Sequence, residues 1–153
     1  MSKYANQSEF ISRTLNILRR YEKECEFEKT LFLNSCLSLL IIPQQAAAHD
    51  GNIRVDGVVD YENWGIDAQK IKYNNHKKGI NANSVENIAY HFRNSLCHYR
   101  FDIMEQNTEK IEQIQIVDMD GGKASFHLDL SFDDFKKFIL KYANELKKKL
   151  ESL

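Results

Sequence analysis

The chain has little of the residues that mark flexible or disulfide-stabilised proteins. Its 153 residues include one proline, six glycines and three cysteines. So few turn-forming residues leave no flexible linker or low-complexity tract, and the length suits a single domain over residues 1–153. An odd number of cysteines without metal-ligand spacing favours reduced structural thiols. We therefore expect a compact cytoplasmic protein.

Long apolar runs and an excess of one charge are also lacking. The longest apolar stretch, residues 37–42, is interrupted by Ser38 and stopped by Pro43. That is far short of the roughly 20 residues that a membrane span needs, so no membrane association is expected. The 21 basic and 22 acidic residues give a net charge of −1. Because the overall charge does not indicate a nucleic-acid binder, any RNA contact must be local.

Apolar residues recur at helical spacing near the N-terminus. They predict a first amphipathic helix from about residue 8 to residue 24. A second helix, from about residue 28 to residue 45, is apolar nearly all round and is expected to be the central, most buried helix. Pro43 removes a backbone donor and is expected to kink or end it.

The connection that follows, residues 46–83, is long for a small domain. Turn signals are frequent from residue 49 onwards, and a short helix is expected near residues 66–73. Trp64, the only tryptophan, is expected to anchor this segment to the core rather than to stack on a base. Connections of this length are often functional, but the role of this one stays open.

A third helix is predicted to open at Asn83, with Glu86 completing a capping box. At about 100° per residue, its apolar and polar residues fall in separate sectors. The apolar sector contains Val85, Ile88, Ala89, Phe92, Leu96 and Tyr99. The polar sector contains His91, Asn94, Ser95, His98 and, if the helix continues that far, Asp102. One face is therefore expected in the core and the other as an exposed polar stripe.

The last third of the chain predicts a hairpin and a final helix. Residues 112–117 and 124–130 alternate polar and apolar about a turn at residues 120–123. Ser131 and Asp134 are expected to cap a helix. The buried stripe of that helix is Phe135, Phe138, Ile139, Tyr142, Leu146 and Leu150. The fold class expected is mainly α, with a small β-hairpin before the C-terminal helix.

The third helix also carries the groups that metal-free chemistry on a phosphodiester needs. Arg93 stays charged and can neutralise a phosphate. Asn94 can orient a hydroxyl or phosphoryl oxygen, and His98 can exchange a proton near pH 7. Since no side chains stand at metal-ligand spacing, we expect neither a metal nor another cofactor.

Residues 93–98, Arg-Asn-Ser-Leu-Cys-His, resemble the signature of the HEPN (higher eukaryote and prokaryote nucleotide-binding) superfamily. Residues 8–15, 32–37 and 39–45 resemble the first two helices of a plasmid-borne HEPN nuclease subfamily. The resemblance covers most of the chain, and only the six-residue motif is specific enough to imply chemistry. It implies a HEPN-like bundle of four to five helices.

The resemblance further implies a metal-independent endoribonuclease of toxin or phage-defence type. Such an enzyme cleaves RNA by attack of the ribose 2′-hydroxyl and leaves a 2′,3′-cyclic phosphate. On this basis His98 is assigned to proton transfer, Arg93 to phosphate stabilisation and Asn94 to orienting the hydroxyl or the histidine. Further candidates for substrate binding are His91, Ser95 and Tyr99.

Arg93 and His98 would lie about 140° apart around an ideal helix, so one protomer does not easily aim both at one phosphate. A two-fold homodimer would bring the Arg93 and His98 side chains of both protomers to one site, as the composite site of the family does. The expected partners are RNA, a second copy of the chain and an antitoxin of the small nucleotidyltransferase type. The alternatives are a HEPN-like dimer that binds RNA, a nucleotide or a protein without cleavage, and a scaffold whose polar stripe lines a wet interface.

Overall fold

The computed structural model describes residues 3–21, 31–41, 54–55, 57, 59–75, 81–105 and 111–152. The chain divides into two compact units. The first consists of Met1–Val55 and Ile139–Leu153, and the second of Asp56–Phe138. Helix α4 (Phe132–Glu151) contributes to both. The single domain expected over residues 1–153 stays a prediction.

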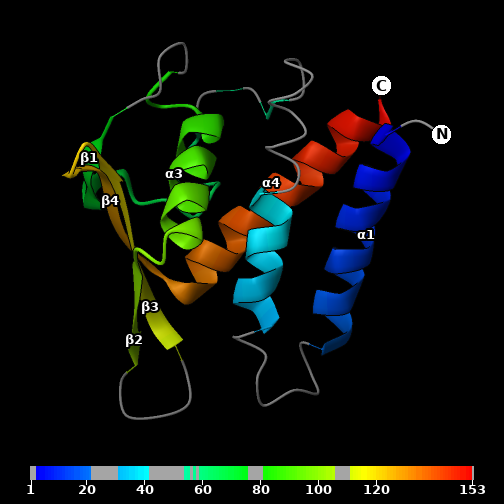
Figure 1. The fold of residues 1–153 in the computed structure, drawn as a ribbon, viewed down its shortest axis with the longest axis horizontal. Coiled ribbons are helices and arrows are strands. Elements are labelled where there is room, and N and C mark those ends of the chain that lie inside the picture. Colours follow the sequence, from blue (N-terminus) through cyan, green and yellow to red (C-terminus); the bar gives the residue numbers. More distant parts are fainter. Residues whose placement is uncertain are drawn as a thin grey trace. The chain divides into compact units, whose positions relative to one another are not determined.

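The described residues of the first unit are helical except near residues 54–55 and at the C-terminal end (Figure 1). They belong to α1 (Lys3–Tyr21), to a helical segment at residues 31–41 and to the C-terminal part of α4. The two N-terminal segments bury Ile11, Thr14, Leu15, Leu18, Phe32, Ser35, Cys36, Leu39 and Leu40. The helical conformation and this burial confirm the two predicted N-terminal helices where they are described. Pro43 lies outside the described residues.

The second unit contains a four-stranded antiparallel sheet in the order β1-β4-β3-β2 (Figure 1). The strands are β1 (Ile71–Asn74), β2 (Phe101–Glu105), β3 (Ile111–Asp120) and β4 (Lys123–Ser131). The expectation of a mainly α helical bundle with a small hairpin is therefore wrong. Strands β1 and β2 add to the two edges of the hairpin and turn the fold into a mixed α/β one.

The β3–β4 hairpin itself is confirmed. Asp120 pairs with Lys123, and Gly121 and Gly122 between them have φ angles of 55° and 82°. Positive φ at both central residues is what the two-residue hairpin turn with the right twist requires, and glycine adopts it without a steric penalty. The Gly-Gly pair thus closes the hairpin beside the Asp120–Lys123 pair, and an irregularity between Asp118 and Met119 shifts the register of the rest of the two strands.

Helix α3 (Val85–Cys97) packs on one face of the sheet. The Phe92 ring lies 6.2 Å from that of Phe126 on β4. Ser84, rather than Asn83, is the N-cap, because its side chain accepts a hydrogen bond from the backbone N–H of Asn87. Asn83 instead accepts a hydrogen bond from the hydroxyl of Tyr61.

Strand β4 alternates between the two faces of the sheet. Phe126, Leu128 and Leu130 are buried on the side of α3. Successive side chains of a strand point to opposite faces, so His127 and Asp129 lie on the other face. The alternation separates an apolar inner face of the sheet from a polar outer one.

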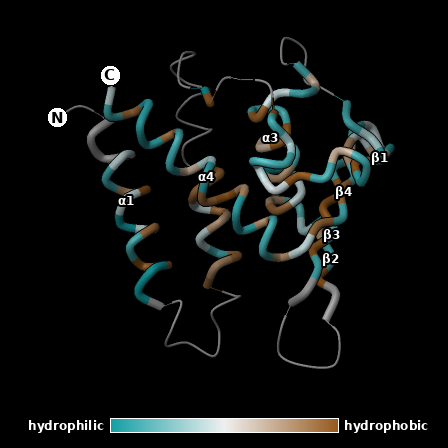
Figure 2. Tube along the Cα trace, turned by 180° about the vertical axis from the view of Figure 1, so that it is seen from behind, coloured by the Kyte–Doolittle hydropathy of each residue, from teal (hydrophilic) through white to brown (hydrophobic). Residues whose placement is uncertain are grey.

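Helix α4 begins as predicted. The Ser131 hydroxyl accepts a hydrogen bond from the backbone N–H of Asp134 at 3.0 Å and donates to its carboxylate at 2.7 Å. The predicted stripe is buried, with no member more than 6% exposed, and consists of Phe135, Phe138, Ile139, Tyr142, Leu146 and Leu150. Figure 2 shows hydrophobic and hydrophilic residues alternating along this helix.

In the described part of the segment before α3, the 3₁₀ turn Ala68–Lys70 is followed by strand β1. The prediction of a short helix near residues 66–73 is therefore wrong from Ile71 onwards, where the chain forms strand β1. Trp64 is 7% exposed and its ring lies 5.5 Å from that of Phe138, which confirms the anchoring role. Within the described ranges, no helix combines the length and the apolar content that a membrane crossing requires.

Candidate functional site

The motif lies at the C-terminal end of α3, where the helix gives way to the sheet. The helix ends at Cys97, and His98 is the C-cap with φ −102° and ψ 11°. The His98 backbone N–H donates to the carbonyls of Asn94 and Leu96, and its side chain is exposed. Because His98 has left the helix, the turn and not the helical period sets the direction of its imidazole.

Arg93 is half-buried and is held by its neighbour on the helix. Its Nε and Nη2 donate to Oδ1 of Asn94 at 3.2 and 2.7 Å. The guanidinium carbon also lies 5.3 Å from the centre of the Tyr90 ring, within the range of a cation–π contact. These contacts give the guanidinium a defined direction at the end of α3.

Asn94 connects this arginine to the sheet. Its Nδ2 donates to Oδ2 of Asp118 on β3 at 3.1 Å. The same carboxylate oxygen accepts from Nδ1 of His91 at 2.9 Å, and the other oxygen accepts from the backbone N–H of Met119 at 2.8 Å. Nη1 of Arg100 lies 3.8 Å from Oδ1. Asp118 thus joins α3, β3 and the turn between helix and sheet.

Asp118 is ionised at neutral pH in this arrangement. Burial by itself raises the pKa of the carboxyl group, since the side chain is only 4% exposed. The hydrogen bonds from His91, Asn94 and the Met119 backbone, together with the charge of His91, outweigh burial and lower the pKa. A buried carboxylate with these partners is a stable negative charge beneath the motif.

His91 is buried rather than exposed. Its side chain is 3% exposed, its Nε2 lies 2.7 Å from the carbonyl of Asn75, and its ring stacks on Phe126 at 4.6 Å. Both ring nitrogens therefore lie against oxygen acceptors. The expectation that His91 belongs to an exposed stripe is wrong, because the sheet covers this side of α3.

Ser95 is also buried, with no exposed surface. Its hydroxyl donates to the carbonyl of Arg100 at 2.6 Å and accepts from the backbone N–H of Val117 at 3.3 Å. The backbone N–H of Arg100 donates in turn to the carbonyl of Ser95 at 2.9 Å. Ser95 therefore fastens the turn after α3 to β3, which leaves no surface for a direct substrate contact.

Tyr99 lies at the tip of this turn and is 85% exposed. Its φ angle is 52°, which places it in the left-handed region, and its ring lies 6.4 Å from that of Phe101. The expectation that Tyr99 belongs to the apolar core sector is wrong, because the helix stops two residues earlier. Asp102 lies on β2 and does not join a helical stripe.

Sequence reasoning found the motif but missed Asp118 and Arg100. A signal for Asp118 was present, because Ile114 and Ile116 are buried at alternate positions of the same strand. Period-two alternation places residue 118 on that buried face, and a carboxylate there needs partners. Nothing in the pattern identified those partners as His91 and Asn94, which come from α3.

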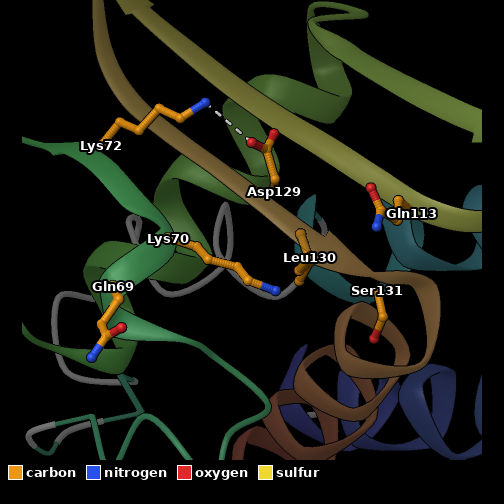
Figure 3. Close-up of a pocket in the computed structure, with 7 residues that line it drawn as sticks. All are labelled: Gln69, Lys70, Lys72, Gln113, Asp129, Leu130 and Ser131. Atoms are coloured by element: carbon orange, nitrogen blue, oxygen red, sulfur yellow. Dashed lines mark hydrogen bonds and ion pairs between the residues drawn. The ribbon is translucent and has the colours of Figure 1, made fainter.

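A separate open groove of about 430 Å³ lies on the face of the sheet opposite α3 (Figure 3). It is lined by Gln69, Lys70, Lys72, Gln113, Asp129, Leu130 and Ser131. The Lys72 amine donates to the Asp129 carboxylate at 3.1 Å. Burial by itself raises the pKa of Asp129. Hydrogen bonds from Gln115, Lys72 and His127 outweigh this effect, so the pKa is lowered overall. This carboxylate offsets the positive charge of Lys72, and the second lysine of the groove, Lys70, lies 4.0 Å from the Asp67 carboxylate.

Of the three cysteines, Cys36 is buried and Cys97 is exposed, and both are free thiols. Cys25 lies outside the described residues. Across the described ranges, no group of three or more His, Cys, Asp or Glu side chains is placed to hold a metal ion.

Fold and site together define a mixed α/β protein whose helix-to-sheet junction displays an Arg-Asn-x-x-x-His segment over a buried carboxylate. A family model described as HEPN pEK499 p136 matches residues 1–153, and the chain belongs to this HEPN family. This confirms the predicted superfamily and its plasmid-borne subfamily. No curated protein and no solved structure matches the chain. Membership indicates a function related to nucleotides or RNA, and HEPN domains are often ribonucleases.

Proposed function

We propose that the protein is a metal-independent endoribonuclease of toxin or phage-defence type. The observation that carries the proposal is the position of His98, which is exposed at the C-cap of α3, the helix that also carries the motif arginine. Arg93 is oriented by Asn94, which links it to the ionised Asp118. A cation and an imidazole supplied by one end of a helix are among the groups that phosphodiester cleavage uses.

In the proposed reaction, the ribose 2′-oxygen attacks the adjacent phosphorus and the bond from phosphorus to the 5′-oxygen breaks. The base accepts the proton of the 2′-hydroxyl, and an acid protonates the leaving 5′-oxygen. The products are a 2′,3′-cyclic phosphate and a 5′-hydroxyl. His98 transfers a proton, and Arg93 neutralises the charge that builds on the non-bridging oxygens.

A homodimer would supply the second proton-transfer group. One protomer offers one exposed imidazole in the motif, whereas the reaction needs a base and an acid. A two-fold axis near the end of α3 would bring two His98 side chains to one scissile phosphate. We also propose that a partner of the small nucleotidyltransferase type, or a trigger, restrains the activity in the cell.

Tyr99 is the proposed contact for a base next to the scissile phosphate. Tyr99 directly follows His98 in the chain, and its exposed ring lies on the turn that the Ser95 hydroxyl holds through the carbonyl of Arg100. Stacking of a base on an aromatic side chain contributes about 1–3 kcal/mol and tolerates any base. Tyr99→Ala should therefore raise KM more than it lowers kcat.

The decisive experiment compares RNA digestion by the wild type, His98→Ala and Arg93→Ala, each with and without EDTA. General acid–base groups contribute about 10²–10⁴-fold, so His98→Ala should lose at least a hundredfold while RNA binding persists. His127→Ala removes a histidine from the outer face of the sheet and serves as the matched control. End-group analysis should find cyclic phosphates.

Undiminished cleavage by His98→Ala, or complete inhibition of the wild type by EDTA, would refute the assignment. If all variants bind RNA and the wild type does not cut it, the protein is a binding module instead.

A further inference from the structure

Asp118 is surrounded by hydrogen-bond donors only. Oδ2 accepts from His91 Nδ1 and from Asn94 Nδ2, at 2.9 and 3.1 Å. Oδ1 accepts from the Met119 backbone N–H at 2.8 Å and faces the Arg100 guanidinium at 3.8 Å. A carboxylate offers acceptors on both oxygens, whereas an amide of the same shape would turn an NH₂ group toward a donor. The position is therefore selective for an ionised aspartate.

The carboxylate also decides which way the Asn94 amide points. Because Nδ2 donates to Asp118, Oδ1 is directed to the other side, where Arg93 donates to it through Nε and Nη2. These hydrogen bonds leave Nη1 of Arg93 for a phosphate oxygen. If the amide were reversed, its NH₂ group would oppose the guanidinium, and the arginine would lose its support.

We propose that Asp118 is a positioning residue of the cleavage site, which acts through Asn94 to hold Arg93 in the direction that receives the phosphate. The proposal rests on the proposed function for its effect on catalysis. It extends the site from the six-residue motif on α3 to a strand of the sheet. In this arrangement Asn94 acts on Arg93 and not directly on the substrate. The hydrogen bond between His91 and Asp118 helps to keep the carboxylate ionised.

The first test is a reciprocal exchange. Asp118→Asn places an NH₂ group against donors, and Asn94→Asp places two carboxylates side by side. Each variant should lower kcat/KM by about 10–100-fold, the loss typical when the partner that orients a functional group is removed. The double variant Asp118→Asn/Asn94→Asp restores the hydrogen bond with donor and acceptor exchanged, provided that His91 adopts the tautomer that accepts through Nδ1 and donates from Nε2 to the Asn75 carbonyl. It should recover at least about tenfold relative to either single variant.

The second test does not depend on cleavage. Solvent exchange of the Arg93 Nε proton, followed by nuclear magnetic resonance, reports its hydrogen bond to Asn94. Exchange should accelerate by at least about tenfold in Asp118→Asn and return toward the wild-type rate in the double variant. Asp129→Asn is the matched control, because Asp129 also accepts from a histidine and an amide but lies on the outer face.

Asn94→Asp keeps the test informative if Asp118→Asn does not fold. If Asp118 does not orient residue 94, the new carboxylate in Asn94→Asp should bind Arg93 more strongly and slow the solvent exchange of the Arg93 Nε proton. If Asp118 does orient residue 94, repulsion between the two carboxylates should turn the new carboxylate away from Arg93, and the exchange should accelerate. Slower exchange in Asn94→Asp, or wild-type exchange and cleavage in a folded Asp118→Asn, overturns the inference. A wild type that cuts no RNA refutes the proposed function alone, because the exchange rates still decide the role of Asp118.

Discussion

Replacing His91 by phenylalanine tests whether the buried contact between His91 and Asp118 beneath the motif stabilises the fold. The variant keeps a flat ring in place of the imidazole that stacks on Phe126 at 4.6 Å. It removes both ring nitrogens, so Asp118 loses the donor at 2.9 Å and the carbonyl of Asn75 loses the donor at 2.7 Å. The shape of the ring is nearly conserved, while its hydrogen bonds are lost.

The expected cost follows from the burial of the pair. Their side chains are 3% and 4% exposed, and a hydrogen bond to a charged group contributes about 1.5–3 kcal/mol. Asp118 keeps hydrogen bonds from Asn94 and from the Met119 backbone, so we expect the loss of the His91 donor to cost about 2–3 kcal/mol. That is a large part of the roughly 5–15 kcal/mol by which most domains are stable.

Urea unfolding at several pH values measures this cost and its origin. The folded-state pKa of Asp118 is lowered, so its ionised form stabilises the fold above the unfolded-state pKa of about 3.9. This contribution is lost as the pH falls through the folded-state pKa. The difference between wild type and His91→Phe should therefore be full at pH 7 and shrink below about pH 4.

The matched control is His127→Phe, whose partner Asp129 has a side chain that is 37% exposed. Since exposed pairs contribute little, this variant should cost less than about 1 kcal/mol. A cost below about 1 kcal/mol for His91→Phe, or a cost that does not change with pH, would refute the reasoning.

Three further outcomes follow from the packing. Phe92→Ala should lower the free energy of unfolding by about 3–5 kcal/mol in urea titrations, because its ring is fully buried and lies 4.8 Å from that of Phe138. Gly65→Ala should lower Tm more than Gly121→Ala. Both have positive φ, but only at the former would the added Cβ meet a backbone oxygen, at 3.0 Å. In the native protein, iodoacetamide should label the exposed thiol of Cys97 and should not label Cys36, because Cys36 is buried and burial raises the pKa of its thiol. Peptide mass spectrometry distinguishes the two cysteines.

Elements with a strong local signal could be predicted from the sequence. The hairpin was predictable because Gly121-Gly122 suits only a tight turn between two alternating runs. The start of α4 was predictable because Ser131 and Asp134 stand three residues apart before an apolar stripe. Strands β1 and β2 could not be predicted in this way. They have four and five residues, and their place in the sheet depends on pairing with β4 and β3.

The motif residues Arg93, Asn94 and His98 could be predicted as candidates from residue type and spacing, and their catalytic roles stay a prediction. Helical periodicity correctly grouped His91 with Asn94 on one side of α3, but it does not say what packs against that side. The sheet packs against that side, so His91 and Asn94, which were predicted to be exposed, contact Asp118 instead. Pairing between elements distant in the sequence carries no local signal, so the contacts of Asp118 with His91 and Asn94 could be found only in the folded chain.

Tyr99 occupies a backbone position that glycine would suit better. Its φ of 52° costs a non-glycine residue about 1–2 kcal/mol, and Ser95 holds the turn in that conformation through the carbonyl of Arg100. Tyr99→Gly should therefore relieve backbone strain. A large ring that is 85% exposed contributes little burial to offset this strain. The natural residue thus works against the stability of its own turn, as expected if its ring serves contact with another molecule.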